Sequence, residues 1–302
     1  MAKKRIFTEE EIQKMIDMYN DGETYSVIGR VVNTKAEKVS QILKDLGYGT
    51  RPLNTLKHYN NSVQTRKYCF NENYFEIIDT PNKAYWLGFL YADGYIQRHT
   101  KEGKTNGGRL TVTLKTDDAY MLESFLIELE SNDTVRNRLL KQGEKTYHQS
   151  SIYLSSVKFV EDLIYHGCIQ NKSLVLQRPV LNEDLASHFI RGYFDGDGCV
   201  QFYPQRYAYS YSVLGTNDVL MYIVESAKLS HYNIRKAKSN SECFELRIFS
   251  KEELIRFHQY IYNNKTMFLK RKYDKSEAMM NHFGANKESS QIEDSLLLCS
   301  NL

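Results

Sequence analysis

Residues 189–198 read FIRGYFDGDG, and residues 85–94 read YWLGFLYADG. Both stretches place a glycine in an apolar run and end on an Asp-Gly pair, and their aspartates, Asp93 and Asp197, are 104 positions apart. A second match follows each stretch, because LKTDD at 114–118 is paralleled by LGTND at 214–218. A repeat of this length predicts two copies of one domain-sized unit.

Small residues four positions apart mark one face of each predicted helix: Gly88 with Ala92, and Gly192 with Gly196. This spacing lets two helix backbones approach closely. If the helices pack in parallel, their C-terminal ends meet and bring Asp93 and Asp197 together. Neighbouring carboxylates repel each other unless a cation lies between them, and oxygen donors select hard cations such as Mg²⁺. An aspartate is also unfavourable at a helix C-terminus, so its presence in both copies indicates a role beyond folding.

The segments after each motif alternate between strand and helix patterns. In residues 109–115, polar and apolar side chains alternate strictly, as in a half-buried strand. Further strands are predicted at 134–140, 147–155, 199–203, 207–214, 233–238 and 243–249, and helices at 117–130, 156–166, 217–229 and 251–262. The sequence therefore predicts an α+β fold of two pseudo-symmetric αββαββα units, whose antiparallel sheets form one concave saddle.

The paired stretches resemble the two motifs of single-chain LAGLIDADG homing endonucleases, over roughly residues 81–280. The matching positions are Gly88, Ala92, Asp93 and Gly94 in the first motif, and Gly192, Asp195, Asp197 and Gly198 in the second. Tyr91 stands where the family often has an acid. The resemblance implies a DNA endonuclease that binds Mg²⁺ or Mn²⁺ between Asp93 and Asp197 and hydrolyses phosphodiester bonds in duplex DNA lying on the saddle.

The resemblance also implies positively charged partners for the metal site. The family often places a lysine before the last helix of each unit, and Lys172 and Lys272 match that position. It also has a polar residue at the end of each unit's second strand, where Lys115 matches but Gly215 does not. The expected catalytic residues are therefore Asp93, Asp197, Lys115, Lys172 and Lys272, in an asymmetric site.

The N-terminal 52 residues have the pattern of three short helices. Thr8 with Glu11, and Thr34 with Glu37, are spaced as capping boxes. An apolar stripe through Val39, Ile42, Leu43 and Leu46 predicts the buried face of the third helix. This layout resembles a helix-turn-helix, whose last helix enters a DNA major groove. The outward residues of that helix are Lys35, Lys38, Gln41 and Lys44.

Other candidate DNA contacts lie in or near the predicted strands. Lys and Arg bind phosphates or guanine edges, and a glutamine amide pairs with adenine. These candidates are Arg98, Arg109, Thr111, Thr113, Arg136, Arg138, Gln201, Gln205, Arg206, Arg235, Lys236 and Lys238. For any single one of them, a solvated surface position remains the alternative interpretation.

Composition excludes several other classes of protein. The five cysteines are scattered without a CxxC pair, which disfavours a disulfide framework and a cysteine zinc site. No apolar run is long enough to cross a membrane, and the N-terminus lacks a secretory apolar region. The net charge is only +3, yet residues 225–275 carry 12 basic and 6 acidic residues, so the positive charge is concentrated locally. We therefore expect an intracellular, cytoplasmic monomer that binds double-stranded DNA and no membrane.

The expected organisation is a helix-turn-helix domain over 1–52, a linker over 53–80, αββαββα units over 81–180 and 181–284, and a tail over 285–302. The expected target is a long, non-palindromic DNA site, because the two units differ in sequence. Two alternatives remain open on the same fold. One is a DNA-binding regulator that does not cut, and the other is a maturase with an RNA partner. Retention of both Asp93 and Asp197 argues against the first.

Overall fold

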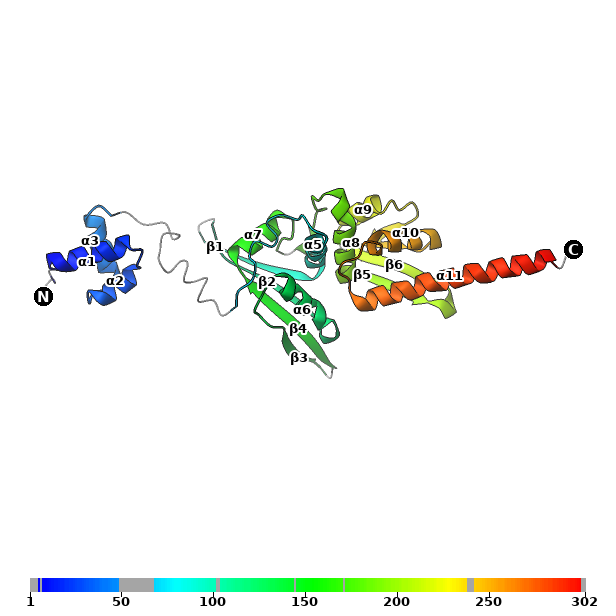
Figure 1. Cartoon of the computed structure of the whole chain (residues 1–302), viewed down its shortest axis with the longest axis horizontal. Coiled ribbons are helices and arrows are strands. Elements are labelled where there is room, and N and C mark those ends of the chain that lie inside the picture. Colours follow the sequence, from blue (N-terminus) through cyan, green and yellow to red (C-terminus); the bar gives the residue numbers. More distant parts are fainter. Residues whose placement is uncertain are drawn as a thin grey trace. The chain divides into compact units, whose positions relative to one another are not determined.

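The computed structural model describes residues 5, 7–48, 68–101, 104–143, 145–170, 172–237 and 242–299. The chain forms two compact parts, Met1–Cys69 and Phe70–Leu302, which we call the N-terminal module and the main body (Figure 1). Among the described residues, no helix is both long and apolar enough to cross a membrane.

The N-terminal module contains helices α1 (Glu9–Asn20), α2 (Tyr25–Val31) and α3 (Ala36–Asp45). Its small core consists of Met15, Tyr19, Ile28, Val32, Val39 and Leu43. The capping box of Thr8 and Glu11 is present at the start of α1. The second predicted capping box is wrong, because Lys35 rather than Thr34 is the N-cap of α3 and no side chain caps that end. Leu46 was also expected in the core, but it lies beyond the last turn of α3 and is exposed.

The turn between α2 and α3 is held by close backbone contacts. Asn33 adopts a left-handed conformation with φ of 52°, which asparagine tolerates better than most residues. A Cβ atom on Gly29 of α2 would lie 2.7 Å from the Thr34 carbonyl oxygen, so a glycine is required at this approach. Arg5 donates to the Val32 carbonyl (3.1 Å) and to Glu11 (2.8 Å), so its side chain stabilises this turn.

The main body contains two consecutive αββαββα units, as the sequence predicts. The first comprises α5 (Pro81–Asp93), β1 (Gly94–Lys101), β2 (Lys104–Lys115), η2 (Thr116–Asp118), α6 (Ala119–Glu128), β3 (Arg136–Gln142), β4 (Lys145–Ser155) and α7 (Val157–Tyr165). A short turn, η3 (Lys172–Leu174), leads to the second, which comprises α8 (Glu183–Asp197), β5 (Gly198–Tyr203), η4 (Pro204–Arg206), β6 (Ala208–Gly215), α9 (Asn217–Ser226), β7 (Asn233–Lys236), β8 (Phe244–Ile248) and α10 (Lys251–Tyr262). The last helix is α11 (Lys270–Cys299).

Each unit forms one four-stranded antiparallel sheet, in the orders β1-β2-β4-β3 and β5-β6-β8-β7. One face of each sheet is apolar and buried, because side chains alternate between the two faces of a strand. In the first sheet the buried face includes Leu110, Val112 and Ile152, and in the second it includes Val213 and Leu246. Helices cover these faces and leave the opposite, polar faces open, so the α+β fold class is confirmed.

Two segments expected to lie outside the units have a different structure. The sequence predicts a linker over 53–80, but Tyr74, Phe75 and Ile78 within it are buried in the core of the main body. Phe75 contacts Phe125 and Phe159, so this stretch covers the first unit. Aromatic residues without regular spacing gave no periodic signal, which explains the error. The predicted tail from residue 285 instead continues α11, which runs to Cys299.

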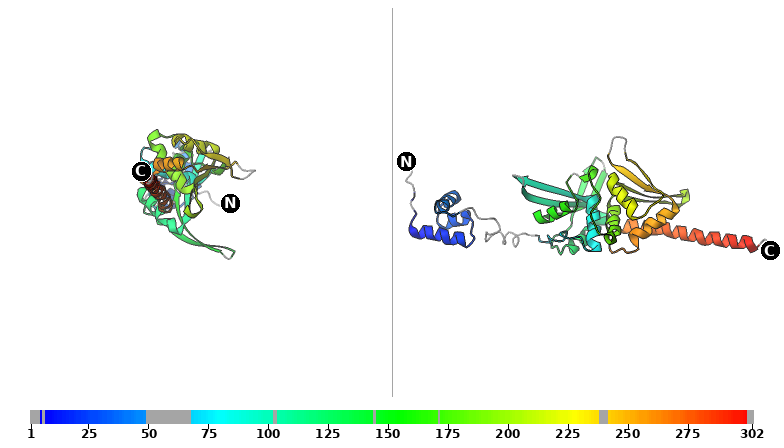
Figure 2. Two further views of the ribbon diagram at one scale, coloured as in Figure 1. Left: turned by 90° about the vertical axis from the view of Figure 1, so that its right-hand side faces the viewer. Right: turned by 90° about the horizontal axis from the view of Figure 1, so that it is seen from above.

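Helices α5 and α8 lie side by side between the two sheets (Figures 1 and 2). A Cβ atom on Gly88 would lie 2.0 Å from the Phe189 carbonyl oxygen, and one on Gly192 would lie 2.0 Å from the Tyr85 carbonyl oxygen. One Cβ atom on Gly196 would lie 2.2 Å from that of Ala92. Contacts advance along both helices in the same direction, so the helices are parallel and their C-terminal ends meet.

We expect Gly192→Ala to lower the free energy of unfolding by more than about 3 kcal/mol, because the added methyl group collides with rigid backbone. Gly284→Ala in α11 is the matched control. Apart from its own helix backbone and chain neighbours, no atom of the described residues lies within 4 Å of a Cβ there, and alanine favours a helix over glycine. Urea denaturation measures both. Equal stability of the two variants would contradict close packing of α5 against α8.

Candidate metal centre and nucleic-acid interface

The two motif aspartates end the two central helices. Asp93 is the last residue of α5 and Asp197 the last of α8, and each precedes the glycine that starts the following strand. The Oδ2 atom of Asp93 lies 3.3 Å from where a Cβ on Gly196 would be, so the Asp93 carboxylate reaches the last turn of α8. The parallel packing therefore brings Asp93 and Asp197 to one place.

Both carboxylates are half-buried, and both have raised pKa values. Burial raises the pKa of Asp197 to about 6, and the neighbouring charge of Asp93 adds to the increase. Burial also raises the pKa of Asp93, while Lys272 and Lys172 oppose that increase. A bound cation would relieve both the repulsion and the desolvation cost.

Two lysines place positive charge beside this pair. Lys172 donates to the Gly94 carbonyl, at the end of α5. Lys272 donates to the carbonyls of Phe194 (2.8 Å), Asp195 (2.7 Å) and Gly196 (3.1 Å), at the end of α8. Both ammonium groups therefore stabilise the negative ends of the helix dipoles. An ammonium group has three N–H donors, so Lys272 has none left for a substrate and offers only its charge.

The two lysines follow the last helices of their units and do not precede them. Lys172 lies after α7, in η3, and Lys272 lies after α10, in the first turn of α11. The prediction that each lysine precedes the last helix is therefore wrong. Burial lowers the pKa of Lys272 to about 8, and the nearby Asp195 carboxylate counteracts this effect.

The donor set fits a hard divalent cation that keeps several waters. Within the described part of the chain, no protein group donates a hydrogen bond to Asp93 or Asp197, so their oxygens are available as ligands. The described residues also contain no cluster of three or more His, Cys, Asp or Glu side chains that could hold a metal ion. Mg²⁺ is typically bound by one or two carboxylates, with water and phosphate oxygens completing its shell.

Lys115 and Gly215 are not equivalent in the sheets. Gly94 pairs with Val112, and Gly198 pairs with Val213, so these two valines occupy equivalent positions in the two sheets. Gly215 therefore corresponds to Leu114 and not to Lys115. A Cβ atom on Gly215 would lie 2.5 Å from the Tyr193 hydroxyl, which explains the glycine. Lys115 is exposed at the end of β2, and among the described residues no hydrogen bond or ion pair joins it to either aspartate.

Asp195 matches the motif in the sequence, but the structure gives it a role that the sequence did not indicate. Its Oδ2 atom accepts from the Tyr85 hydroxyl (2.8 Å) and from the Leu269 amide (2.7 Å). The side chain is fully buried, and burial raises its pKa to about 6. Asp195 therefore joins α5, α8 and the start of α11, and so fixes the segment that carries Lys272.

The sequence also did not predict two salt bridges between the units, because nothing in a sequence indicates which charged residues far apart along the chain will pair. Arg271 donates to Asp118 (2.9 Å), and Arg178 donates to Asp218 (2.8 Å). Burial raises the pKa of Asp93 and the charge of Arg271 opposes that increase, whereas no arginine among the described residues opposes the increase at Asp197. The surroundings of the two motif aspartates therefore differ.

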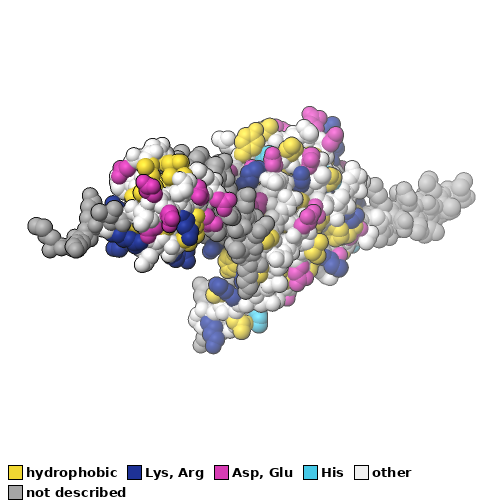
Figure 3. All heavy atoms as spheres, turned by 60° about the vertical axis from the view of Figure 1, so that its left-hand side comes forward, with side chains coloured by type: hydrophobic (Ala, Val, Ile, Leu, Met, Phe, Trp, Pro, Cys, Tyr) yellow, Lys and Arg dark blue, Asp and Glu magenta, His cyan; other side chains and the backbone are white. Residues whose placement is uncertain are grey.

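The open face of the first sheet carries most of the predicted DNA contacts of that unit. Register pairs Thr111 with Tyr153, and Thr113 with Ser151, which itself pairs with Arg136. Five predicted residues share this face: Arg109, Thr111, Thr113, Arg136 and Arg138. Lys and Arg side chains are visible on the projecting β3–β4 hairpin (Figure 3).

Arg98 is not part of that face. It pairs with Gly108, so its side chain lies on the helix-covered side, where it forms an ion pair with Glu161 of α7 (3.1 Å). Arg98 therefore lies on the opposite side of the sheet from Arg109, because side chains alternate along a strand, and we propose no DNA contact for it.

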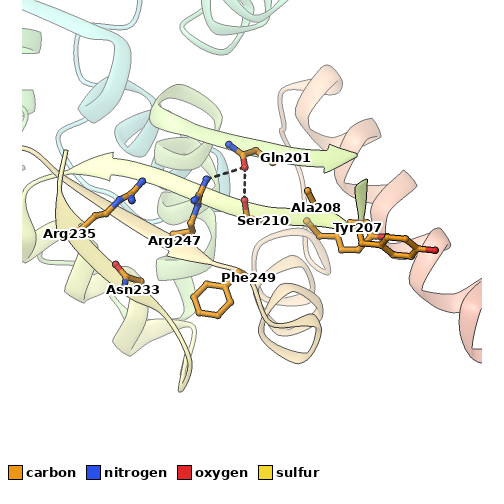
Figure 4. A pocket seen from close by; sticks show the side chains of 9 residues that line it. Gln201, Tyr207, Ala208, Ser210, Asn233, Arg235, Arg247 and Phe249 are labelled. Carbon is orange, nitrogen blue, oxygen red and sulfur yellow. Dashed lines mark hydrogen bonds between the residues drawn. The ribbon is translucent and has the colours of Figure 1, made fainter. Parts of the chain in front are cut away.

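The open face of the second sheet has a shallow hollow of about 550 Å³ (Figure 4). Gln201 and Arg235 line it, together with Arg247, which the sequence reasoning missed. Gln205 and Arg206 are exposed in η4. Lys236 pairs with Phe244 and bridges to Glu242 (3.2 Å), on the side of the buried Leu246. Lys238 lies outside the described residues.

In the N-terminal module, the residues predicted to contact DNA lie at the start of α3 and within it. Lys35 is its N-cap, and Lys38, Gln41 and Lys44 lie within it. Lys35, Gln41 and Lys44 are exposed, and Lys38 is half-buried. The Gln41 amide donates to Asp45 (2.7 Å), which leaves its oxygen available.

We expect Lys272→Met to lower the free energy of unfolding by about 2 kcal/mol, because three carbonyls at the end of α8 lose their donor. Lys270→Met is the control, since Lys270 is exposed two residues earlier and its side chain pairs, among the described residues, with Asp274. It should leave stability nearly unchanged. Thermal unfolding compares the two, and an equal loss would show that the capping bonds are unimportant.

The buried Asp195 predicts a pH-dependent stability. Its folded-state pKa of about 6 lies above its ordinary value of 3.8, so the folded state binds this proton more tightly than the unfolded state. The resulting stabilisation is complete below about pH 4 and is lost as the pH rises through about 6. Relative to wild type, Asp195→Asn should therefore gain about 1–3 kcal/mol between these pH values. Urea titrations across this range measure the difference, and a flat difference would contradict the raised pKa.

Comparisons with known proteins bear on residues 184–262, which match the LAGLIDADG-like domain family. No curated protein matches the chain. Among solved structures, the N-terminal LAGLIDADG domain of DUF199/WhiA is 18% identical, with 64% of this chain and 89% of that chain covered and a TM-score of 0.40. The LAGLIDADG homing endonuclease I-GzeII, in complex with its DNA target, is 11% identical, with 70% and 92% covered and a TM-score of 0.46. The family match therefore identifies a LAGLIDADG-like domain in the second αββαββα unit of this chain.

Proposed function

We propose that this chain is a site-specific DNA endonuclease that makes double-strand breaks by metal-dependent phosphodiester hydrolysis. The observation that carries the proposal is the meeting of Asp93 and Asp197 at the ends of two parallel helices. Two half-buried carboxylates that accept from no protein donor among the described residues, beside two lysines, form a site that needs a cation and attracts a phosphate.

In this proposal Asp93 and Asp197 hold Mg²⁺ or Mn²⁺, which when bound polarises a water for attack on phosphorus. Lys172 and Lys272 contribute positive charge near the scissile phosphate, where negative charge increases during hydrolysis. Their ammonium groups are held by backbone carbonyls at the helix ends, so this charge is already in place before DNA binds.

The open faces of the two sheets would bind the DNA on either side of the aspartates. The first face supplies Arg109, Arg136 and Arg138, and the second supplies Gln201 and Arg247. Since the two faces differ in sequence, the target would not be a strict palindrome. The N-terminal module would bind flanking DNA through α3 as a helix-turn-helix, and so raise affinity through effective concentration.

Cleavage of a randomised duplex library tests the proposal, in Mg²⁺ and then in EDTA. We expect cuts that require the metal, and loss of at least about 100-fold in cleavage rate in Asp93→Asn and Asp197→Asn, with DNA binding retained. Asp184→Asn is the control, because Asp184 is exposed at the opposite end of α8. It should cut like wild type.

Other outcomes would identify a different function. Sequence-specific binding without cleavage in any divalent metal would indicate a DNA-binding regulator. Tighter binding to structured RNA than to any selected duplex would indicate a maturase. Cleavage that persists in EDTA, or in both aspartate variants, would contradict the assignment of Asp93 and Asp197.

A further inference from the structure

The side chain of Gln201 is held in one orientation on the open face of the second sheet. Its Oε1 atom accepts from Arg247 Nη2 (3.1 Å) and from Ser210 Oγ (2.9 Å). Arginine has donors and no acceptor, so the Gln201 atom that faces Arg247 must be the oxygen. The amide orientation therefore follows from chemistry, and Figure 4 shows the oxygen directed at both partners.

This orientation leaves Gln201 with donors only. A carbonyl oxygen has two lone pairs, and both are used by Arg247 and Ser210. The Nε2 atom has no protein acceptor within the described residues, and it is not among their buried unpartnered atoms, so it is open to the hollow. Gln201 can thus donate two hydrogen bonds outward and accept none.

The neighbouring groups strengthen this bias toward donation. Arg247 keeps its Nη1 group without a protein acceptor among the described residues, and it lines the same hollow. Arg235 also lines the hollow, but its guanidinium is occupied by Glu245 through Nε (3.0 Å) and Nη2 (2.7 Å). Within the described residues, Gln201 and Arg247 therefore both offer free donors in the hollow, beside the Nη1 group of Arg235.

The first sheet provides a contrast at the related position. Gln97 stands four residues after Asp93, as Gln201 stands four after Asp197. Its cross-strand neighbour is Arg109 instead of Ser210, and Arg109 donates to Ser155. Within the described chain, no protein hydrogen bond orients the Gln97 amide. The fixed amide is therefore a feature of the second sheet.

We propose that Gln201 and Arg247 form a reader for guanine in the major groove of the DNA target. Guanine presents two acceptors there, O6 and N7, whereas adenine presents an acceptor and a donor, N7 and N6. A glutamine pairs with adenine only when its oxygen is free to accept from N6, and here that oxygen is engaged. This inference rests on the proposed DNA-binding function and differs from the expectation that glutamine reads adenine.

An isosteric substitution tests the reader. In Gln201→Glu one carboxylate oxygen still accepts from Arg247 and Ser210, but the outward atom becomes an acceptor. The full-length chain is used in Ca²⁺ to select bound duplexes from a randomised library, and the selected sequences are read. Wild type should prefer guanine at one position by about 5- to 100-fold, and Gln201→Glu should prefer cytosine or adenine there, whose exocyclic amines donate.

Two further variants complete the test. Gln259→Glu is the control, because it makes the same change of charge on the exposed face of α10. This helix packs through Phe257 against Tyr211, on the buried side of the second sheet and away from the hollow. It should select the wild-type sequence. Arg247→Met releases the Gln201 amide, and the preference at that position should broaden to include adenine.

The possible failures are distinguishable. If Gln201→Glu weakens binding to all sequences equally and lowers its salt dependence by about one charge, the donors bind a phosphate and the guanine reader is overturned. If Gln201→Glu selects the same sequence as wild type, the reader is overturned while the proposed function stands. If wild type and Gln259→Glu both select no sequence, site-specific binding itself fails, and the reader with it.

Discussion

The structure of the main body depends on direct backbone contact between α5 and α8. Gly88 and Gly192 each lie where a methyl group would collide with a carbonyl of the other helix, so the contact is reciprocal about the pseudo-twofold axis. This contact makes the helices parallel and adjacent, and it therefore brings two carboxylates to one place. Asp195 reinforces it by accepting from Tyr85 across the interface.

The same contact creates an electrostatic problem at the helix ends. Two aspartates, two helix C-termini and a buried Asp195 concentrate negative charge there, and burial raises the pKa values of all three side chains. Lys172 and Lys272 offset part of this charge by donating to the terminal carbonyls. The remaining deficit of positive charge lies between Asp93 and Asp197, where a divalent cation fits the donor set.

On the open sheet faces, the positions and pairing of the charged side chains matter more than the net charge of the chain. A net charge of +3 would suggest little affinity for nucleic acid, yet register aligns arginines on one face of the first sheet. On the second sheet, internal pairing decides what each residue offers: Glu245 occupies Arg235, while Arg247 and Ser210 orient Gln201. Neighbouring side chains therefore control recognition as much as residue type does.

Local patterns in the sequence were enough to identify the repeated unit, the order of its elements and the two aspartates, because glycine spacing, strand alternation and helix periodicity involve residues close together in the chain. The sequence also indicated which strand residues share a face, apart from Arg98 and Lys236, whose positions depend on pairing with Gly108 and Phe244. Only the tertiary structure decided the burial of residues 70–80, the capping role of Lys272 and the orientation of Gln201. Those features depend on contacts between residues that are distant in sequence, and no periodic pattern in the amino-acid sequence indicates such contacts.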